Sequence, residues 1–269
     1  MNLTSPSQVK AWCIENEFHP NKVLGQNFLI DRNALEAIVD AGLDGAELSS
    51  DGKVDVLEIG PGLGVLTEEM LNRGARVTAV EKDPVLAGRL KAALGNPADL
   101  EVIAGDALEV RPEGRFGCMV SNLPYQAGTR ILLELVQRRE LPTMTVLVQT
   151  EVAERLAAKE GSKTRGLAGV WAQLDYDVKI VRKVSASCFW PRPEIGSSVV
   201  KLVRHDRNID FSAECRKFFH SLTKKAFEHR RKQLGSIFKD LIQSTARAEE
   251  LSNEDWLELT KGLMNHDNT

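Results

Sequence analysis

The sequence DVLEIGPGLG, residues 55–64, joins a short apolar run to a turn that contains three glycines. The run has the length and composition of a buried strand, and the following VLTEEMLNRG (65–74) has the pattern of a helix that ends on Gly74. Glycines let the backbone approach a ligand closely and reach conformations that a Cβ atom forbids. We therefore expect a ligand-binding turn at the carboxyl end of a strand.

Strand and helix signals alternate on both sides of this stretch. A proline begins PVLAGRLKAALG (84–95) and a glycine ends it, as is typical of a helix. The other predicted strands are RVTAVE (76–81), LEVIAG (100–105), GCMVSN (117–122), TMTVLVQ (143–149), YDVKIVRKV (176–184) and SSVVKLVRH (197–205). Continuously apolar strands that alternate with helices predict an α/β fold with a mostly parallel, seven-stranded sheet covered on both faces.

The periodicity becomes helical from about Asp210 to the end of the chain. Ser252 and Asp255 in SNEDW resemble a capping box at the start of one of these helices. We predict two domains, a sheet domain over residues 1–206 and a small all-helical domain over residues 207–269.

The composition limits the classes of function. The 269 residues include 35 basic and 38 acidic side chains, so a nucleic-acid partner would need a local basic patch. No apolar run reaches the ~20 residues that span a bilayer, and MNLTSPSQVK resembles no secretion signal. The four cysteines form no C-x-x-C pair, which predicts neither a metal site nor a disulfide framework and favours a reducing cytoplasm.

Acidic residues follow the glycine turn at the next two strand ends. Gly60, Gly62 and Gly64 have the spacing G-x-G-x-G. Glu81 follows Gly60 by twenty-one residues, where a carboxylate accepts both hydroxyls of a ribose, and Asp106 is placed to accept from an adenine amino group. A tight turn without ligand and two exposed strand-end charges are the alternative. The three features together favour an adenosine-containing cofactor, and the glycine spacing favours S-adenosylmethionine over a nicotinamide dinucleotide.

The fourth strand ends in Asn-Leu-Pro-Tyr (122–125). The exocyclic amine of adenine is a weak nucleophile because its lone pair is delocalised into the ring. The Asn122 side-chain oxygen and the Leu123 carbonyl would accept its two N–H bonds and turn the lone pair toward an electrophile. Pro124 fixes φ and supplies no competing N–H, and the ring of Tyr125 would stack on a flipped base. The alternative is an Asx-type turn with a core tyrosine.

With these motifs the sequence resembles the small-subunit ribosomal RNA adenine N6-dimethyltransferases, from about Lys22 to Leu234. KVLGQNFLID (22–31) resembles the family's N-terminal signature. EIGPGLGVLT, VEKD, GDAL and NLPY match its cofactor and catalytic motifs in order, and VQTEVAERLAAKEGSK (148–163) resembles its next helix and loop. FWPRPEIGSSVV (189–200) resembles its F-x-P-x-P-x-V-x-S element, with Ile195 in place of the usual valine. The loop KTRGLAG departs from the family's usual tyrosine-glycine.

The resemblance implies a Rossmann-like S-adenosylmethionine-dependent methyltransferase fold and dimethylation of two adjacent adenines near the 3′ end of small-subunit rRNA. Asn27, Leu29, Gly60, Gly62, Glu81, Asp106 and Asn122 would contact the methyl donor, and Phe189 would offer a second aromatic surface to the base. The implied partner is rRNA within a pre-ribosomal small subunit. We expect a cytoplasmic monomer that binds no membrane and no metal.

Basic residues gather between Arg216 and Lys239. If this segment is one helix, Lys217, Lys224 and Arg231 form a single stripe. The residues that we expect to bind RNA are Lys224, Lys225, Arg230, Arg231 and Lys232. Arg155, Lys159, Lys163 and Arg165 form a second predicted cluster. Solvated charged faces are the alternative for both.

Three other functions remain open. The first is a large-subunit adenine methyltransferase of the antibiotic-resistance type, although Pro61 and VLTEEML fit the small-subunit type better. The second is a ribosome-assembly or transcription factor whose catalysis is dispensable. The third is a nicotinamide-dependent dehydrogenase.

Overall fold

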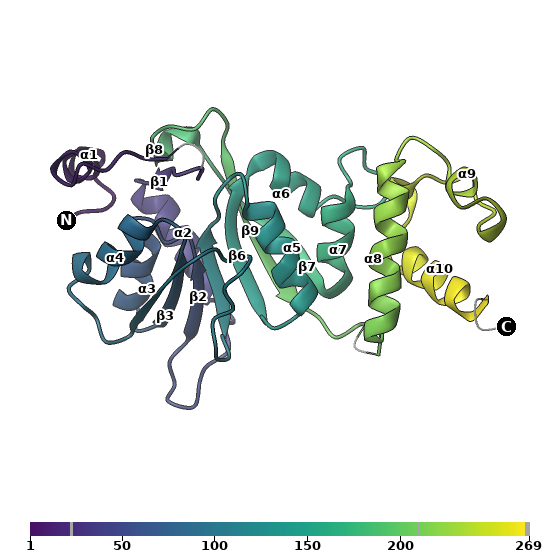
Figure 1. The fold of residues 1–269 in the computed structure, drawn as a ribbon, viewed down its shortest axis with the longest axis horizontal. Helices are drawn as coiled ribbons and strands as arrows, with labels where there is room; N and C mark the ends of the chain where they lie inside the picture. Colours follow the sequence, from purple (N-terminus) through teal and green to yellow (C-terminus); the bar gives the residue numbers. More distant parts are fainter. Residues whose placement is uncertain (22–23, 209, 267–269) are drawn as a thin grey trace. The chain divides into compact units, whose positions relative to one another are not determined.

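The computed structural model describes residues 1–21, 24–208 and 210–266, so Lys22 and Val23 of the N-terminal signature lie outside the described residues. The chain forms two compact units (Figure 1). The first contains Met1–Ala153 and Lys179–Arg204, and the second contains Glu154–Val178 and the described residues from His205 onward.

A seven-stranded sheet with the order β4-β3-β2-β5-β6-β9-β7 organises the chain. The strand bounds are β2 Asp55–Ile59, β3 Arg76–Glu81, β4 Leu100–Ala104, β5 Cys118–Asn122, β6 Thr143–Gln149, β7 Tyr176–Val184 and β9 Ser197–Arg204. Each predicted strand is present within one residue of its predicted bounds. β2 pairs in parallel with β3 and β5, β3 with β4, and β5 with β6, while β9 pairs antiparallel with β6. The predicted α/β fold with a mostly parallel sheet is confirmed.

The parallel register brings four strand ends to one edge of the sheet. Ile59 lies opposite Val80, Glu81 lies opposite Ala104, and Asn122 lies opposite Leu147. Since parallel strands present their carboxyl ends on the same side, the turns after β2, β3, β4 and β5 all face one region.

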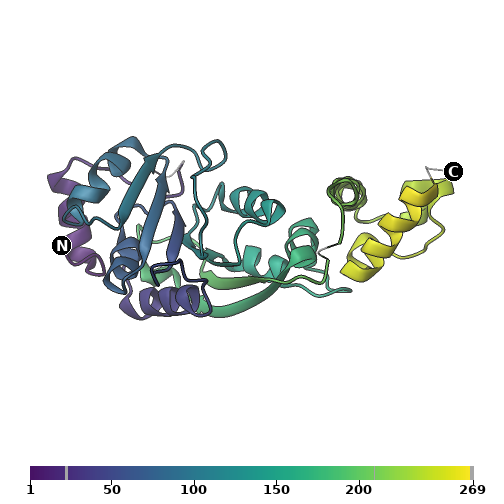
Figure 2. The ribbon, with the colours of Figure 1, turned by 90° about the horizontal axis from the view of Figure 1, so that it is seen from below.

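Helices cover both faces of the sheet. Successive side chains of a strand point to opposite faces, and the central strands are buried almost continuously, so both faces need a cover. Val56, Val120 and Leu147 belong to one buried cluster with residues of α2 (Arg32–Leu43) and α3 (Val65–Asn72). α4 (Pro84–Ala93) packs beside β3 and β4, and α5 (Gly128–Arg138) buries Ile131, Leu132 and Val136. α2 and α5 lie on opposite faces of the sheet (Figure 2).

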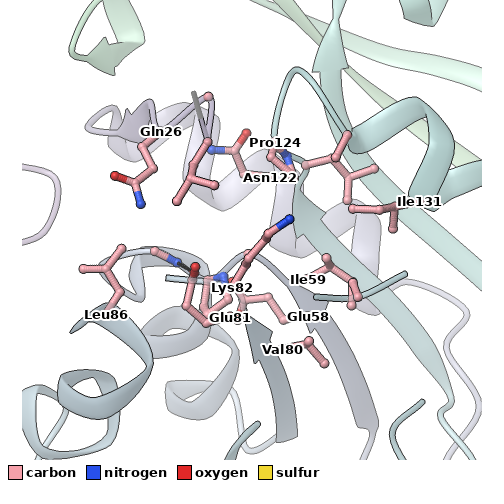
Figure 3. Close-up of a pocket in the computed structure, with 18 of the residues that line it drawn as sticks. Gln26, Glu58, Ile59, Val80, Glu81, Lys82, Leu86, Asn122, Pro124 and Ile131 are labelled. Carbon is pink, nitrogen blue, oxygen red and sulfur yellow. Dashed lines mark hydrogen bonds between the residues drawn. The ribbon is translucent and has the colours of Figure 1, made fainter. Parts of the chain in front are cut away.

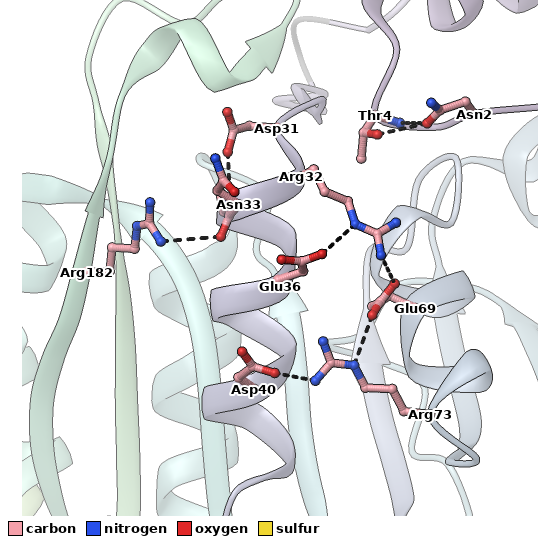
Figure 4. A network of polar contacts seen from close by, with 11 residues as sticks. Asn2, Thr4, Asp31, Arg32, Asn33, Glu36, Asp40, Glu69, Arg73 and Arg182 are labelled. Atoms are coloured by element: carbon pink, nitrogen blue, oxygen red, sulfur yellow. Dashed lines mark hydrogen bonds and ion pairs between the residues drawn. The ribbon is translucent and has the colours of Figure 1, made fainter.

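Ion pairs join α2 to α3 on the surface (Figure 4). Arg32 donates to Glu36 at 2.7 Å and lies 3.5 Å from Glu69. Arg73 donates to Glu69 at 2.9 Å and also pairs with Asp40. Arg32, Glu36 and Asp40 belong to α2, Glu69 belongs to α3 and Arg73 follows it, so the network links the two helices on one side of the sheet.

The N-terminal segment packs against the same unit. α1 (Pro6–Glu15) buries Val9 and Cys13, and β1 (Phe28–Leu29) pairs antiparallel with β8 (Phe189–Trp190), which follows the 3-10 turn η1 (Ala186–Cys188). The rings of Phe28 and Trp190 are stacked with centroids 6.5 Å apart. The two segments around residues 27 and 189, both of which resemble motifs of the family, are therefore neighbours in space.

The second unit is helical around its own apolar core. Its helices are α7 (Leu167–Asp175), α8 (Ala213–Glu228), α9 (Leu234–Phe238) and α10 (Asn253–His266), with 3-10 turns η2 (Lys239–Leu241) and η3 (Ala248–Glu250), and α6 (Thr150–Leu156) precedes them. Ser252 and Asp255 form the predicted capping contacts, since each accepts the other's backbone N–H.

The division predicted at residue 206 differs from the compact units at one segment. Val170 and Leu174 of α7 pack with Phe219 and Trp256, and Asp175 accepts from Arg216 at 2.5 Å in a buried ion pair. Residues 154–178 therefore belong with the C-terminal helices, although most of β7 and all of β9 follow them in the chain.

Candidate functional site

A cavity of about 480 Å³ lies in the first unit at the carboxyl ends of β2, β3, β4 and β5 (Figure 3). Its walls come from the turns after these strands and from the N-terminal segment. The predicted site residues that line it are Asn27, Leu29, Gly60, Gly62, Glu81, Asp106, Asn122, Leu123, Pro124 and Tyr125. The structure thus brings together residues that are up to 98 positions apart in the sequence.

The glycine turn forms one wall. Gly60, Gly62 and Gly64 have φ values of 69°, 59° and 90°, which favour glycine over residues with a Cβ atom. A Cβ on Gly62 would lie 3.1 Å from the ring of Phe28. A larger residue at position 62 would therefore be strained and would crowd the space beside the turn.

Glu81 is buried at the end of β3 and holds the glycine turn in place. Its Oε2 accepts from the Gly62 N–H at 3.0 Å, and its Oε1 accepts from the Asp83 N–H at 2.8 Å. Burial raises the pKa of Glu81, while these two backbone donors lower it in part. Asp83 caps α4 and also accepts from Gln26 at 2.9 Å, which ties the N-terminal segment to this strand end.

Asp106 stands at the end of β4 with an ion-pair partner that sequence reasoning missed. Its Oδ2 accepts from Lys82 Nζ at 2.7 Å, and its Oδ1 accepts from the Leu108 N–H at 3.0 Å. The Lys82 hydrogen bond holds the pKa of Asp106 below its ordinary value, so this carboxylate stays charged to a lower pH than an isolated one. Lys82 follows Glu81 directly, and its place at a strand end was the available signal.

Glu58 is a second residue that sequence reasoning missed. Its carboxyl lines the cavity, lies fully buried and accepts from the Thr67 hydroxyl at 2.6 Å. Burial is the main cause that raises the pKa of Glu58 to about 8, and the nearby Glu81 carboxylate adds to the rise. An acidic residue in the apolar strand 55–59 was the signal, because buried carboxyls are rare without a partner.

Asn122 ends β5 with its amide oriented by the N-terminal segment. Its Nδ2 donates to the Asn27 carbonyl at 3.2 Å. Within the described residues, no protein group donates to its Oδ1 or to the Leu123 carbonyl. The Leu123 N–H is held by the Leu147 carbonyl at 3.1 Å, and the Pro124 carbonyl accepts from Gly128 at 2.7 Å. The loop is therefore anchored on both sides of two unused acceptor oxygens.

The two predicted aromatic residues lie in different environments. Tyr125 is half-buried in the cavity wall, and its hydroxyl forms a 2.7 Å hydrogen bond with Ser197. Phe189 is only 2% exposed and packs in the sheet core, outside the cavity lining among the described residues. The expectation that Phe189 offers a surface to a base stays a prediction, and in this structure the side chain is buried beside the β1–β8 pair.

The basic residues of the second unit do not form the single helical stripe that the sequence predicts. α8 ends at Glu228, so Lys224 and Lys225 lie on the helix while Arg231 and Lys232 follow it. All four are exposed. Arg230 is half-buried, donates to the Lys163 carbonyl and lies 3.7 Å from Glu249. The predicted stripe through Arg231 is therefore wrong, because the helix ends before that residue.

One residue of the second predicted basic cluster, Arg165, is buried and not on the surface. Arg165 is 1% exposed and donates to Asn253 at 2.8 Å and to the Ala158 carbonyl at 3.2 Å. It holds the loop after α6 against the start of α10, in the position where the resembling family usually has tyrosine.

Two features that the described residues lack bear on other classes of function. Across residues 1–21, 24–208 and 210–266, no helix combines the length and apolar character needed to cross a membrane. In the same described residues, no group of three or more His, Cys, Asp or Glu side chains is placed to hold a metal ion.

The cavity fits an adenosine-containing methyl donor. A glycine-rich turn, a buried carboxylate and a charged carboxylate follow three adjacent strands, and the unused Asn122 oxygen stands at the fourth. This fold and this site define the class of S-adenosylmethionine-dependent methyltransferases that act on an amine.

Comparison with known proteins identifies the family. Residues 17–261 match the family described as ribosomal RNA adenine dimethylase, and the chain belongs to this family. It is 39% identical over 249 residues to the ribosomal RNA small subunit methyltransferase A of Chlamydia caviae, covering 90% of this chain and 86% of the relative. It is 45% identical over 208 residues to the protein of the same name from Deinococcus radiodurans, covering 74% and 67%.

Solved structures agree on the fold. A dimethyladenosine transferase from Plasmodium falciparum superposes with a TM-score of 0.74 at 23% identity, covering 89% of this chain and 97% of that one. A 23S rRNA methyltransferase superposes with a TM-score of 0.67 at 25% identity, covering 88% and 100%. The chain is an rRNA adenine dimethylase that uses S-adenosylmethionine.

Proposed function

We propose that this enzyme dimethylates N6 of two adjacent adenines near the 3′ end of small-subunit rRNA during assembly of the subunit. The relatives from Chlamydia caviae and Deinococcus radiodurans are both named as small-subunit methyltransferases. The observation that carries the chemistry is the Asn122 amide, whose Nδ2 is held by Asn27 while its Oδ1 has no protein donor within the described residues.

The cofactor would occupy the 480 Å³ cavity and supply an electrophilic methyl group. Gly60 and Gly62 would lie against it, with Asn27 and Leu29 on the side of the N-terminal segment. Glu81 would accept from the ribose hydroxyls, because its carboxylate is already fixed by two backbone N–H groups. Asp106 would accept from the adenine amino group, with its carboxylate positioned by Lys82 and the Leu108 N–H.

Asn122 and Leu123 would act on the target adenine. Their two unused oxygens accept the N–H bonds of the amine and direct its lone pair into the cavity. Pro124 and the hydrogen bond from Gly128 hold this turn rigid, so the acceptors need no reorganisation when the base arrives. The ring of Tyr125 supplies the stacking surface, worth ~1–3 kcal/mol per base. The proton released from the amine passes to solvent, which requires no general base.

Replacing Asn122 tests this assignment. Asn122→Ala removes one of two acceptors at the reacting atom, and we expect methyl transfer to fall by about 10²-fold or more. Affinity for S-adenosylmethionine should stay within a few-fold, as measured by calorimetry on the free enzyme.

Asn72→Ala is the matched control, because Asn72 is exposed at the end of α3. An Asn122→Ala enzyme that lost cofactor affinity but kept its turnover at saturating cofactor would refute the role of the amide.

The substrate subunit is tested separately. Mass spectrometry of rRNA fragments from cells with and without the enzyme should reveal dimethyladenine in the small-subunit RNA. Methyl groups confined to the large-subunit RNA would instead support the alternative, which the likeness to the 23S rRNA methyltransferase keeps in view.

Four exposed basic residues of the second unit would bind RNA phosphates, namely Lys224, Lys225, Arg231 and Lys232. Arg230 would position this segment through the Lys163 carbonyl instead of contacting RNA directly. We further propose that the enzyme works as a monomer on the pre-ribosomal subunit in the cytoplasm, a compartment suited to its four free cysteines.

A further inference from the structure

A second cavity, of about 320 Å³, lies in the first unit at the opposite edge of the sheet from the active site. It is lined by the segments that precede β5 and β6 and by the last residue of β9. Arg204 ends β9, and its N–H donates to the Pro142 carbonyl at 2.8 Å, which joins these segments at one edge. Because β5 is five residues long and ends on Asn122, about 16 Å separate this edge from the active site.

Arginines dominate the lining of this cavity. Arg111, Arg115, Arg138 and Arg204 line it, and Glu140 is the acidic residue among the lining residues. The half-buried ring of Phe116 and the side chains of Leu57, Leu135 and Leu141 form its apolar part. Four guanidinium groups against the carboxylates of Glu140 and Glu47 give a local excess of positive charge in a chain whose net charge is −3.

Few of these charges are firmly neutralised. Arg111 pairs with Glu140 and Arg115 pairs with Glu47 at 2.7 Å, but all four side chains are exposed. Exposed pairs of this kind contribute about 0–1 kcal/mol, so an anion can replace the carboxylates. The Arg138 side chain has no ion pair or hydrogen bond among the described residues. Arg204 donates to the Arg139 carbonyl at 2.7 Å, which leaves its charge uncompensated.

We propose that this cavity, hereafter the arginine groove, binds backbone phosphates of the rRNA substrate away from the methylated bases. Guanidinium groups match phosphate oxygens with two parallel hydrogen bonds, which suits a fixed contact better than a lysine stem does. The 16 Å to Asn122 means that the groove would bind a different part of the folded RNA than the flipped adenine. The inference rests on the proposed small-subunit substrate and adds a contact that the catalytic cavity does not supply.

The test compares binding of full-length enzyme to small subunits isolated from cells that lack this methyltransferase. Arg111→Gln/Arg138→Gln should weaken binding at 0.1 M salt by about tenfold or more, and should reduce the slope of log K against log salt by about 1.5. Affinity for S-adenosylmethionine should not change. Arg111→Lys/Arg138→Lys keeps both positive charges and should retain the wild-type salt slope. If the guanidinium groups had only a structural role, this variant would lose binding as the glutamine variant does.

Arg207→Gln/Lys10→Gln is the matched control, because it also removes two positive charges. Arg207 is 61% exposed and paired with Asp177, much as Arg111 is 64% exposed and paired with Glu140, and Lys10 is exposed on α1. If the groove variant binds with the same affinity and slope as this control while wild-type enzyme methylates the subunits, the groove proposal fails alone. If wild-type enzyme does not methylate small subunits but methylates large-subunit RNA, the proposed function fails.

Discussion

Asn122 depends for its orientation on a residue 95 positions earlier in the chain. An amide that ends a strand can turn either its oxygen or its nitrogen toward a ligand. The Asn27 carbonyl accepts from Nδ2, so the oxygen remains for an incoming donor. Glu81 shows the same dependence, since both of its oxygens are held by N–H groups of neighbouring turns. At this scale, residue type supplies the chemistry and a distant backbone group selects its direction.

Glu58 carries a pH dependence that follows from its burial. Its pKa is raised from 4.5 to about 8, so the folded state favours the protonated carboxyl. Its contribution to stability is therefore full below about pH 4.5 and is lost as the pH rises toward 8. Within this window the free energy of unfolding should fall by at most about 1.4 kcal/mol per pH unit from this group.

Glu58→Gln keeps an acceptor for Thr67 and removes the titration. We expect urea unfolding of this variant between pH 5 and pH 8 to show a shallower decline than wild type. Parallel declines in the two proteins would mean that other groups cause the pH dependence.

Helix α7 illustrates how an element can belong to a unit that the chain order does not suggest. It is followed by two strands of the sheet, yet Val170 and Leu174 pack with residues of α8 and α10. Gly169 permits α7 to pack closely against α6, because a Cβ at this position would lie 2.4 Å from the Arg155 carbonyl oxygen.

A fragment of residues 1–206 should therefore expose the apolar face of α7 and strand the Asp175 carboxylate without Arg216. We expect the fragment to bind a hydrophobic dye and to associate in sedimentation experiments. Val170→Ser/Leu174→Ser in the same fragment should reduce dye binding. A monomeric fragment without dye binding would contradict this assignment of α7.

For the molecule as a whole, the net charge does not show how the charges are distributed over its surface. The chain has a net charge of −3, yet exposed basic residues gather after the middle of α8 and around the arginine groove. An acidic total keeps nonspecific attraction to nucleic acid weak, while local patches supply salt-dependent contacts.

The helical patch makes a prediction of its own. Lys224→Gln/Arg231→Gln should lower affinity for small-subunit RNA and reduce the salt slope by about 1.5, with no effect on cofactor affinity. Lys10→Gln/Lys91→Gln makes the same change in net charge at exposed sites on α1 and α4. Equal losses in the two variants would show that overall charge, and not this patch, governs the interaction.

Much of the fold and of the lining of the candidate site could be predicted because it rests on local patterns. Continuous apolar strands of five to nine residues, helix-ending glycines and acidic strand ends are each readable in a short window. Lys82 and Glu58 were missed because their importance comes from neighbours, Asp106 in one case and complete burial in the other. The end of α8 at Glu228 was missed because no proline or glycine marks it.

The amino-acid sequence alone determined the α/β class, the order of the strands along the chain, the glycine turn and the acceptor residues at successive strand ends. These depend on periodicity and residue chemistry, which are local. Folding in three dimensions determined which way Asn122 faces, that Phe189 lies in the core, and that α7 joins the C-terminal helices. It also gathered four arginines from separate segments at the far edge of the sheet. Such features depend on contacts between residues distant in sequence, which no single stretch of the chain encodes.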